Sequence, residues 1–142
     1  MTESELIKLY SSSHKNETNI LIHYICVPII FLNVVSLIYY YSPLYLTAVI
    51  VALSFIFYIR SLKSYLLPMV ALYIICFACC FFLAPLPYFV EANITLFVIA
   101  WIGQFVGHKI EGKNPSFFQN IFFLLVGPAW VAAKIKMNLL RR

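Results

Sequence analysis

The side chains that could carry chemistry in this sequence are three histidines and one glutamate. His14 and His23 lie near the N-terminus, whereas His108 and Glu111 lie close together much later in the chain. Imidazole and carboxylate groups are ligands of iron, zinc, manganese and nickel. Two or three histidines with one carboxylate suit ferrous oxygen chemistry, and they suit a hydrolytic zinc site equally well, so residue type and spacing leave both open.

The spacing of the histidines restricts how they could meet. Nine positions separate His14 from His23, so an unbroken helix would place them on opposite faces. The polar run at residues 15–19 offers a turn that would let them converge. Helical spacing also places polar side chains on shared faces: Asn19 with His23, and Gln104 with His108 and Glu111.

The composition indicates which class of protein must position these groups. Of 142 residues, 63% are hydrophobic and 11% are charged, against roughly 45–50% and 25% in soluble domains. No soluble fold of this size could bury so much apolar surface, whereas a bilayer solvates it. The first nineteen residues are polar and do not resemble a secretory signal, so we expect the first apolar segment to be retained as a true span.

We therefore expect an all-α fold, a multi-pass transmembrane helical bundle that forms a single domain over residues 1–142. A polar N-terminal segment (1–19) with a short amphipathic helix would precede a four-span core (20–116). The spans are predicted at about 20–40, 44–58, 65–83 and 93–107, the second and fourth being short for a bilayer. Gly127-Pro128 should interrupt the last segment (117–142), which we expect to form a re-entrant or interfacial helical hairpin.

The positive charges predict the orientation of the bundle. With a cytosolic N-terminus, that side holds six cations before the last segment, and the opposite loops, 41–43 and 85–92, hold none. A fifth full span would move the cations of the C-terminal tail to the wrong side. All three histidines then lie at the cytosolic interface. The net charge of +5 reflects this topology, so we expect no nucleic-acid partner.

Polar side chains at the edge of a span are costly in lipid and usually mark function, although interfacial His and Glu also simply reach into headgroups. A metal carrier should hold polar residues at mid-span in several helices, and the first three spans have only Asn33, Ser36 and Ser54 there. A zinc-dependent membrane lipid hydrolase and a non-enzymatic scaffold or metal carrier remain the alternatives to an iron enzyme.

Cys76-x-x-Cys79 lies in an apolar run, where cysteine acts as a small hydrophobic residue.

Two segments of the sequence resemble a known family. The first reads Tyr10-x3-His14-x-Asn16-x2-Asn19-x3-His23-x4-Pro28, and the second reads Trp101-Ile-x-Gln104-Phe-x-Gly107-His108-x2-Glu111-x3-Pro115. In order and spacing, this pairing is similar to the membrane family of fungal 2-hydroxy fatty acid dioxygenases and their bacterial homologues. The fungal members act in phytosphingosine breakdown.

The resemblance implies an Fe(II)-dependent α-oxidation, in which O2 cleaves the C1–C2 bond of a 2-hydroxy fatty acid. It implies that His14, His23 and His108 bind the iron and that Glu111 and Gln104 act at the catalytic centre, Glu111 as a fourth ligand or by orienting one. Asn16, Asn19 and Lys113 would contact the substrate or orient ligands, with Lys15 or Lys109 helping to attract the carboxylate. The location would be the inner membrane of a bacterium or the endoplasmic reticulum of a eukaryote, with membrane lipid around the protein.

Overall fold

The computed structural model describes residues 1–114 and 122–140, which are largely helical. The elements in chain order are α1 (Glu3–Ser11), α2 (Glu17–Tyr41), α3 (Leu44–Ser61), the short 3-10 helix η1 (Lys63–Tyr65), α4 (Leu66–Leu83), α5 (Phe89–Glu111) and α6 (Phe123–Leu140). The predicted all-α class is confirmed.

Four helical stretches are long and apolar enough to cross a membrane, as predicted: α2, α3, η1 together with α4, and α5. The fourth stretch is longer than expected, because α5 spans 23 residues and begins at Phe89. Glu91, which was expected in the preceding loop, lies in the first turn of α5, where a carboxylate is favoured by the helix dipole. The expectation that this span is short is therefore wrong.

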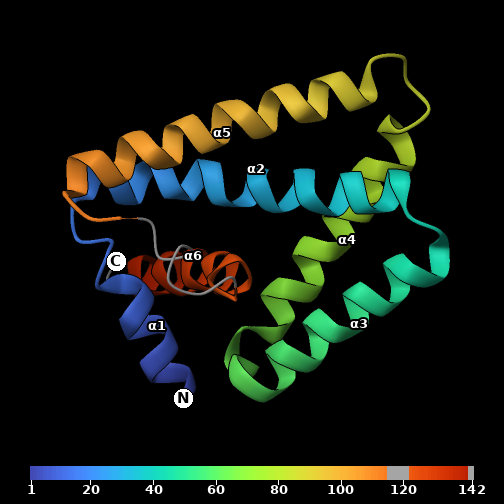
Figure 1. The fold of residues 1–142 in the computed structure, drawn as a ribbon. Coiled ribbons are helices and arrows are strands. Elements are labelled where there is room, and N and C mark those ends of the chain that lie inside the picture. The colour runs from blue at the N-terminus through green and yellow to red at the C-terminus, as the bar shows by residue number, and fades with distance from the viewer. Residues whose placement is uncertain (115–121, 141–142) are drawn as a thin grey trace.

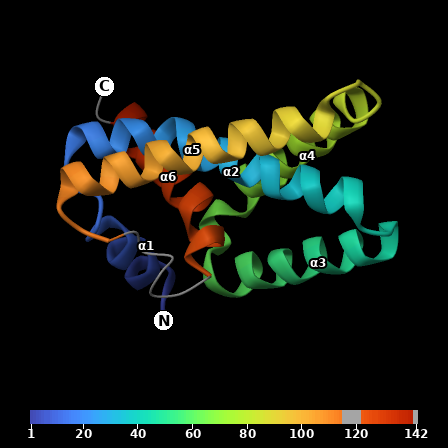
Figure 2. The same cartoon turned by 45° about the horizontal axis from the view of Figure 1, so that its top comes forward.

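The apolar helices form two pairs that diverge from each other. α2 and α5 run side by side along their lengths, and α3 and α4 form a second hairpin that meets α2 near its C-terminal end (Figure 1). The space between the pairs widens toward the end of the molecule that holds α1. α6 lies in this opening and packs against α1, α2 and α4 (Figure 2). The C-terminal helix thus fills the wider end of the space between the two helix pairs.

The predicted interruption of the C-terminal segment is wrong. α6 continues through Gly127 and Pro128 as one helix, and Ala129 and Trp130, directly after them, are fully buried. A side chain at Gly127 would meet the Tyr10 hydroxyl at 3.0 Å and Val27 at 3.2 Å, so glycine lets α6 approach α1 and α2 closely. Tight packing offsets the helical cost of proline. Residues 117–121 and 141–142 of the predicted segment lie outside the described residues.

The predicted break between the first two histidines is confirmed, but of the polar run 15–19 only Lys15 and Asn16 belong to it, because α2 begins at Glu17. α1 begins with a capping box between Thr2 and Glu5 and ends at Ser11, and α2 begins after its N-cap, Asn16. Residues 12–16 therefore form a non-helical connection. This break points the chain back on itself and frees His14 from the helical periodicity that would have separated it from His23.

Candidate metal centre

Three elements bring the three histidines together at one end of the bundle. His14 lies in the connection between α1 and α2, His23 lies in the second turn of α2, and His108 lies in the last turn of α5. The ring centroids are 4.3 Å apart for His14 and His23, 4.8 Å for His14 and His108, and 4.9 Å for His23 and His108. All three side chains are buried, with at most 3% of their surface exposed. The predicted convergence of distant imidazoles is confirmed.

Backbone carbonyls fix the tautomers of two of these rings. His14 Nδ1 lies 2.7 Å from the Tyr10 carbonyl oxygen, and His23 Nδ1 lies 2.8 Å from the Asn19 carbonyl oxygen. A carbonyl can only accept, so each Nδ1 carries a proton and donates it. In the neutral ring, Nε2 then presents a lone pair, which is the arrangement that backbone carbonyls impose on metal-binding histidines when they accept the proton of the other ring nitrogen.

One nitrogen of each ring has no hydrogen-bond partner among the described residues, although it is buried. These atoms are Nε2 of His14, Nε2 of His23 and Nδ1 of His108. One ligand nitrogen from each ring lies within 4.8 Å of those of the other two. Buried polar atoms almost always find a partner, and three unpartnered nitrogens on rings this close together fit a shared cation. The group could therefore hold a metal ion.

The electrostatics of His14 also suit a metal ligand. Burial lowers the pKa of His14 to about 4, against a partial opposing effect of its hydrogen bond to the Tyr10 carbonyl. Because a metal binds the deprotonated ring, an imidazole that stays neutral at physiological pH requires no proton release when an ion arrives. Tyr10 stacks flat on His14, with ring centroids 4.4 Å apart and planes within 4°, and this fixes the ring orientation.

Glu111 lies beside the three histidines, and its carboxylate accepts N–H groups around the start of α2. Its carboxylate accepts the backbone N–H of Lys15 at 3.0 Å, the backbone N–H of Asn16 at 2.7 Å and the side-chain N–H of Asn19 at 3.2 Å. The carboxylate thus accepts N–H groups just before and at the start of α2. A helix N-terminus favours an anion because its first N–H groups lack partners within the helix. It ties the end of α5 to the connection that carries His14.

The other predicted site residues have distinct surroundings. Asn16 is the N-cap of α2, and its side-chain oxygen accepts the backbone N–H of Thr18 at 2.9 Å. Asn19 is fully buried and connects Glu111 to His23 through its side chain and its carbonyl. Lys113 Nζ donates to the Ser12 carbonyl at 2.8 Å, so it also binds the connection between α1 and α2.

Three neighbours of the site were not assigned a role from the sequence: Tyr10, Gly107 and Trp130. Trp130 of α6 is fully buried against His14, with ring centroids 4.9 Å apart, and its indole N–H donates to the Ser11 hydroxyl at 2.8 Å. A side chain at Gly107 would overlap the Asn19 amide. The apolar face of Phe123, Val126 and Trp130, at helical spacing, was the signal that could have placed α6 here.

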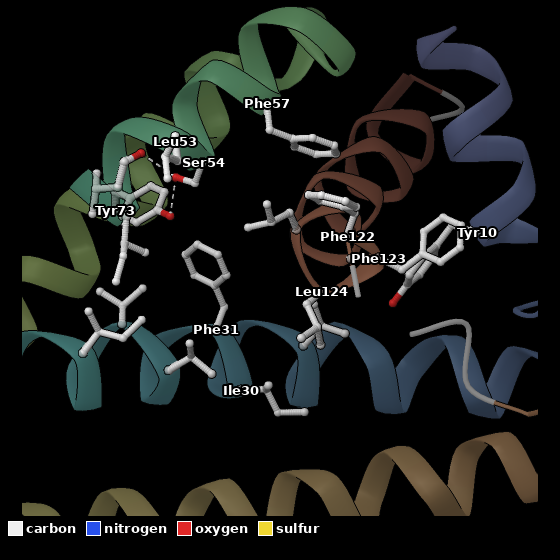
Figure 3. Close-up of a pocket in the computed structure, with 18 of the residues that line it drawn as sticks. Tyr10, Ile30, Phe31, Leu53, Ser54, Phe57, Tyr73, Phe122, Phe123 and Leu124 are labelled. Atoms are coloured by element: carbon white, nitrogen blue, oxygen red, sulfur yellow. Dashed lines mark hydrogen bonds between the residues drawn. The ribbon is translucent and has the colours of Figure 1, made fainter. Parts of the chain in front are cut away.

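Two hollows meet at His108. An apolar cavity of about 300 Å³ extends from Tyr10, Gln104 and His108 between α2, α3 and α6, and Figure 3 shows Tyr10 at one end and Ser54 and Tyr73 at the other. A second hollow, of about 360 Å³, is lined by His108, Lys109, Lys113 and Asn114. His108 therefore separates an apolar space inside the bundle from a cationic recess.

The comparisons with known proteins agree with this geometry. Residues 2–139 match the family model described as 2-hydroxy-palmitic acid dioxygenase Mpo1-like. The chain is 35% identical over 122 residues to the Saccharomyces cerevisiae protein named 2-hydroxy-palmitic acid dioxygenase MPO1. The aligned region covers 82% of this chain and 69% of the yeast protein. No solved structure matches. A match over nearly the full length shows that this chain belongs to the 2-hydroxy-palmitic acid dioxygenase Mpo1-like family.

Proposed function

We propose that the protein is an Fe(II)-dependent dioxygenase that converts a 2-hydroxy fatty acid into the fatty acid one carbon shorter. The overall reaction is R–CH(OH)–COOH + O2 → R–COOH + CO2 + H2O. The C1–C2 bond breaks, C1 leaves as CO2, and C2 becomes the new carboxyl carbon. O2 accepts all four electrons that C1 and C2 lose, so the balance needs no external reductant.

The observation that carries this proposal is a group of three buried histidines whose ligand atoms lie within 4.8 Å of one another, each with one ring nitrogen that has no partner among the described residues. Nitrogen ligands with open positions suit ferrous oxygen chemistry, and the related yeast protein is named a dioxygenase. Iron held there by His14, His23 and His108 would supply the activation of O2. The protein's own residues position the ligands and the substrate.

We assign positioning roles to the polar residues around the histidines. Asn19 orients His23 through its carbonyl, and the Tyr10 carbonyl orients His14. Glu111 fixes the chain segment on which His14 lies. Ligand-orienting groups of this kind commonly contribute ten- to a hundred-fold to metal affinity.

The substrate head would lie at His108, where the two hollows meet. Gln104 is 6% exposed and lines the apolar cavity one turn before His108, so its amide can contact the hydroxyl or carboxylate of the substrate. Lys109 and Lys113 line the adjoining recess and attract the carboxylate through their charge. Catalytic groups would thus surround the polar end of an amphiphile at the membrane interface.

The positive-inside rule supports a cytosolic position for this end of the bundle, in the inner membrane of a bacterium or the endoplasmic reticulum of a eukaryote. Substituting a cysteine for Lys113 in an otherwise cysteine-free protein should give a thiol that an impermeant reagent labels from the cytosolic side. Labelling from the opposite side would reject the orientation.

The test of the activity is metal analysis of the purified protein combined with O2 uptake on 2-hydroxypalmitate. We expect close to one iron per chain and O2 consumption that requires the 2-hydroxy group, with palmitate as the inactive comparison. His23→Ala and His108→Ala should lose both iron and turnover. Asn93→Ala serves as the control, because Asn93 is a buried amide at the other end of α5.

The same measurements separate the alternatives. Turnover that survives both histidine substitutions would reject the assignment of the ligands. Zinc without O2 uptake would favour a lipid hydrolase, and bound metal without any conversion of lipid would favour a scaffold or carrier.

A further inference from the structure

We infer that the apolar cavity between α2, α3 and α6 holds the alkyl tail of the substrate, and that Ser54 and Tyr73 set the longest tail it accepts. This inference rests on the proposed function. It adds to that function a site for the tail and names the residues that decide chain length.

The position of the cavity connects it to the metal site. The cavity begins at Tyr10, Gln104 and His108, and its remaining lining is almost entirely aliphatic and aromatic. Tyr10 stacks on His14, and the His108 ring belongs to the metal group itself. A chain that left the metal site through this opening would pass directly from polar ligands into an apolar space.

The dimensions of the cavity fit a long alkyl tail. Engineered cavities of about 150 Å³ hold a benzene ring, so about 300 Å³ has room for roughly a dozen carbons. This estimate is close to the tail of 2-hydroxypalmitate.

The end of the cavity away from His108 is built to be rigid. The Ser54 hydroxyl lies 2.7 Å from the Tyr73 hydroxyl and donates to the Val51 carbonyl at 2.7 Å. The Tyr73 ring lies between Phe31 and Phe55, each with its centroid 5.1 Å away. Figure 3 shows this hydroxyl pair facing the space that Phe31 enters from α2. Because the two hydroxyls satisfy each other, the wall can meet an alkyl chain without losing a hydrogen bond.

The experiment measures chain-length preference in two variants that change the cavity in opposite directions. Ser54→Phe should fill the far end and move the preferred 2-hydroxy acid roughly four to six carbons shorter, since a phenyl ring occupies about half of the space. Tyr73→Ala should open that end and raise turnover of acids longer than 2-hydroxypalmitate. O2 uptake is measured across a graded series of saturated 2-hydroxy acids.

Two matched variants control for unrelated effects. Ile74→Ala removes a neighbouring side chain on the exposed side of α4, where Ile74 is 63% exposed, and should leave the chain-length preference unchanged. Ile56→Phe adds the same ring as Ser54→Phe on the exposed side of α3, where Ile56 is 47% exposed, and should also leave the preference unchanged. If Ser54→Phe and Tyr73→Ala have the same chain-length preference as these controls, the inference is overturned.

Binding to the metal-free protein separates this inference from the proposed activity. Displacement of a fluorescent fatty acid by saturated acids of graded length reports on the cavity without any turnover. If this displacement shifts with Ser54→Phe while no 2-hydroxy acid supports O2 uptake by the unaltered protein, the cavity inference holds and the proposed activity fails. If turnover occurs and displacement is the same in all variants, the cavity inference fails alone.

Discussion

The carboxylate of Glu111 accepts a hydrogen bond from the backbone N–H of Asn16 at 2.7 Å, which joins the last residue of α5 to the N-cap of α2. The same carboxylate receives the backbone N–H of Lys15 at 3.0 Å. His14 directly precedes these two donors, and His108 lies one turn before Glu111. One side chain therefore sets the distance between two histidines that come from opposite ends of the sequence.

Removal of this carboxylate should weaken metal binding without removing a ligand. In Glu111→Ala, three N–H donors lose their acceptor and the connection that carries His14 loosens, so we expect metal affinity to fall about ten- to a hundred-fold. Glu111→Gln keeps one acceptor oxygen and should give an intermediate loss. Metal titration of the purified variants measures this. Glu91→Ala, at the other end of α5, is the control, and an unchanged affinity in Glu111→Ala would contradict the positioning role.

A single methyl group at Gly107 should disturb the same site from the helix interface. The added Cβ would overlap the Asn19 amide, and Asn19 holds both Glu111 and His23. Overpacking of this kind costs about 1–3 kcal/mol of folding stability. Here it displaces Asn19, whose carbonyl orients the His23 ring. We expect Gly107→Ala to lose at least roughly ten-fold in metal affinity, as measured by metal titration.

Gly103→Ala provides the comparison on the same face of α5. Its added Cβ would meet the Cys26 thiol at 2.8 Å, and that side chain can rotate away because Cys26 is only partly buried. Gly103→Ala should therefore retain most of the metal affinity. Equal losses in the two variants would show that helix packing in general, rather than the Asn19 contact, limits binding.

The sequence was sufficient to predict the convergence of the histidines, because two regular features imply it. The nine-residue spacing of His14 and His23 requires a break that the polar residues between them can provide, and an even number of spans returns the chain to the starting face. The hydrogen bonds of Glu111 were not predictable in this way. A carboxylate near histidines can bind a metal, accept backbone N–H groups or do both, and spacing alone does not place the N–H groups of Lys15 and Asn16 beside it.

The C-terminal helix shows why local signals were insufficient. Gly127 and Pro128 disfavour a helix interior, so the sequence predicted an interruption there. In the structure, Gly127 allows close approach to Tyr10 and Val27, and the burial of Trp130 favours a continuous helix. Tertiary packing overrides the local preference, and neither the contact of Trp130 with His14 nor the shape of the apolar cavity can be read from spacing.

The metal-free protein should lose stability as the pH falls below 6.5. Burial lowers the pKa of His14 from 6.5 to about 4, so the unfolded chain takes up a proton at a higher pH than the folded chain. The stabilisation is complete above pH 6.5 and is lost as the pH falls toward 4. At pH 5 the loss is about 2 kcal/mol for this one group.

The measurement is the thermal unfolding midpoint at pH 7.5 and pH 5 after removal of metal. The midpoint should fall at the lower pH, and His14→Phe, which keeps an aromatic ring against Tyr10, should show a smaller fall. An equal fall in the two proteins would mean that His14 is already protonated in the folded state at pH 5.

Trp130 should report directly on the metal. Its ring centroid lies 4.9 Å from that of His14 and 6.3 Å from that of His23, and the sequence contains two tryptophans in all. In Trp101→Phe, Trp130 is the remaining tryptophan, and an open-shell ion such as Fe(II) or Co(II) held by the histidines should quench its emission under anaerobic conditions. Zn(II) should compete for the same histidines. Because its d shell is filled, bound Zn(II) should not quench, so its addition should restore the emission.

A second substitution makes this result specific to the histidine group. His23→Ala in the Trp101→Phe background should abolish the quenching at the same ion concentration, whereas Asn93→Ala in that background should retain it. Because the readout needs no substrate and no O2, it tests the position of the ion independently of catalysis. Quenching that persists without His23 would place the ion elsewhere near α6, and the three-histidine assignment would then have to be abandoned.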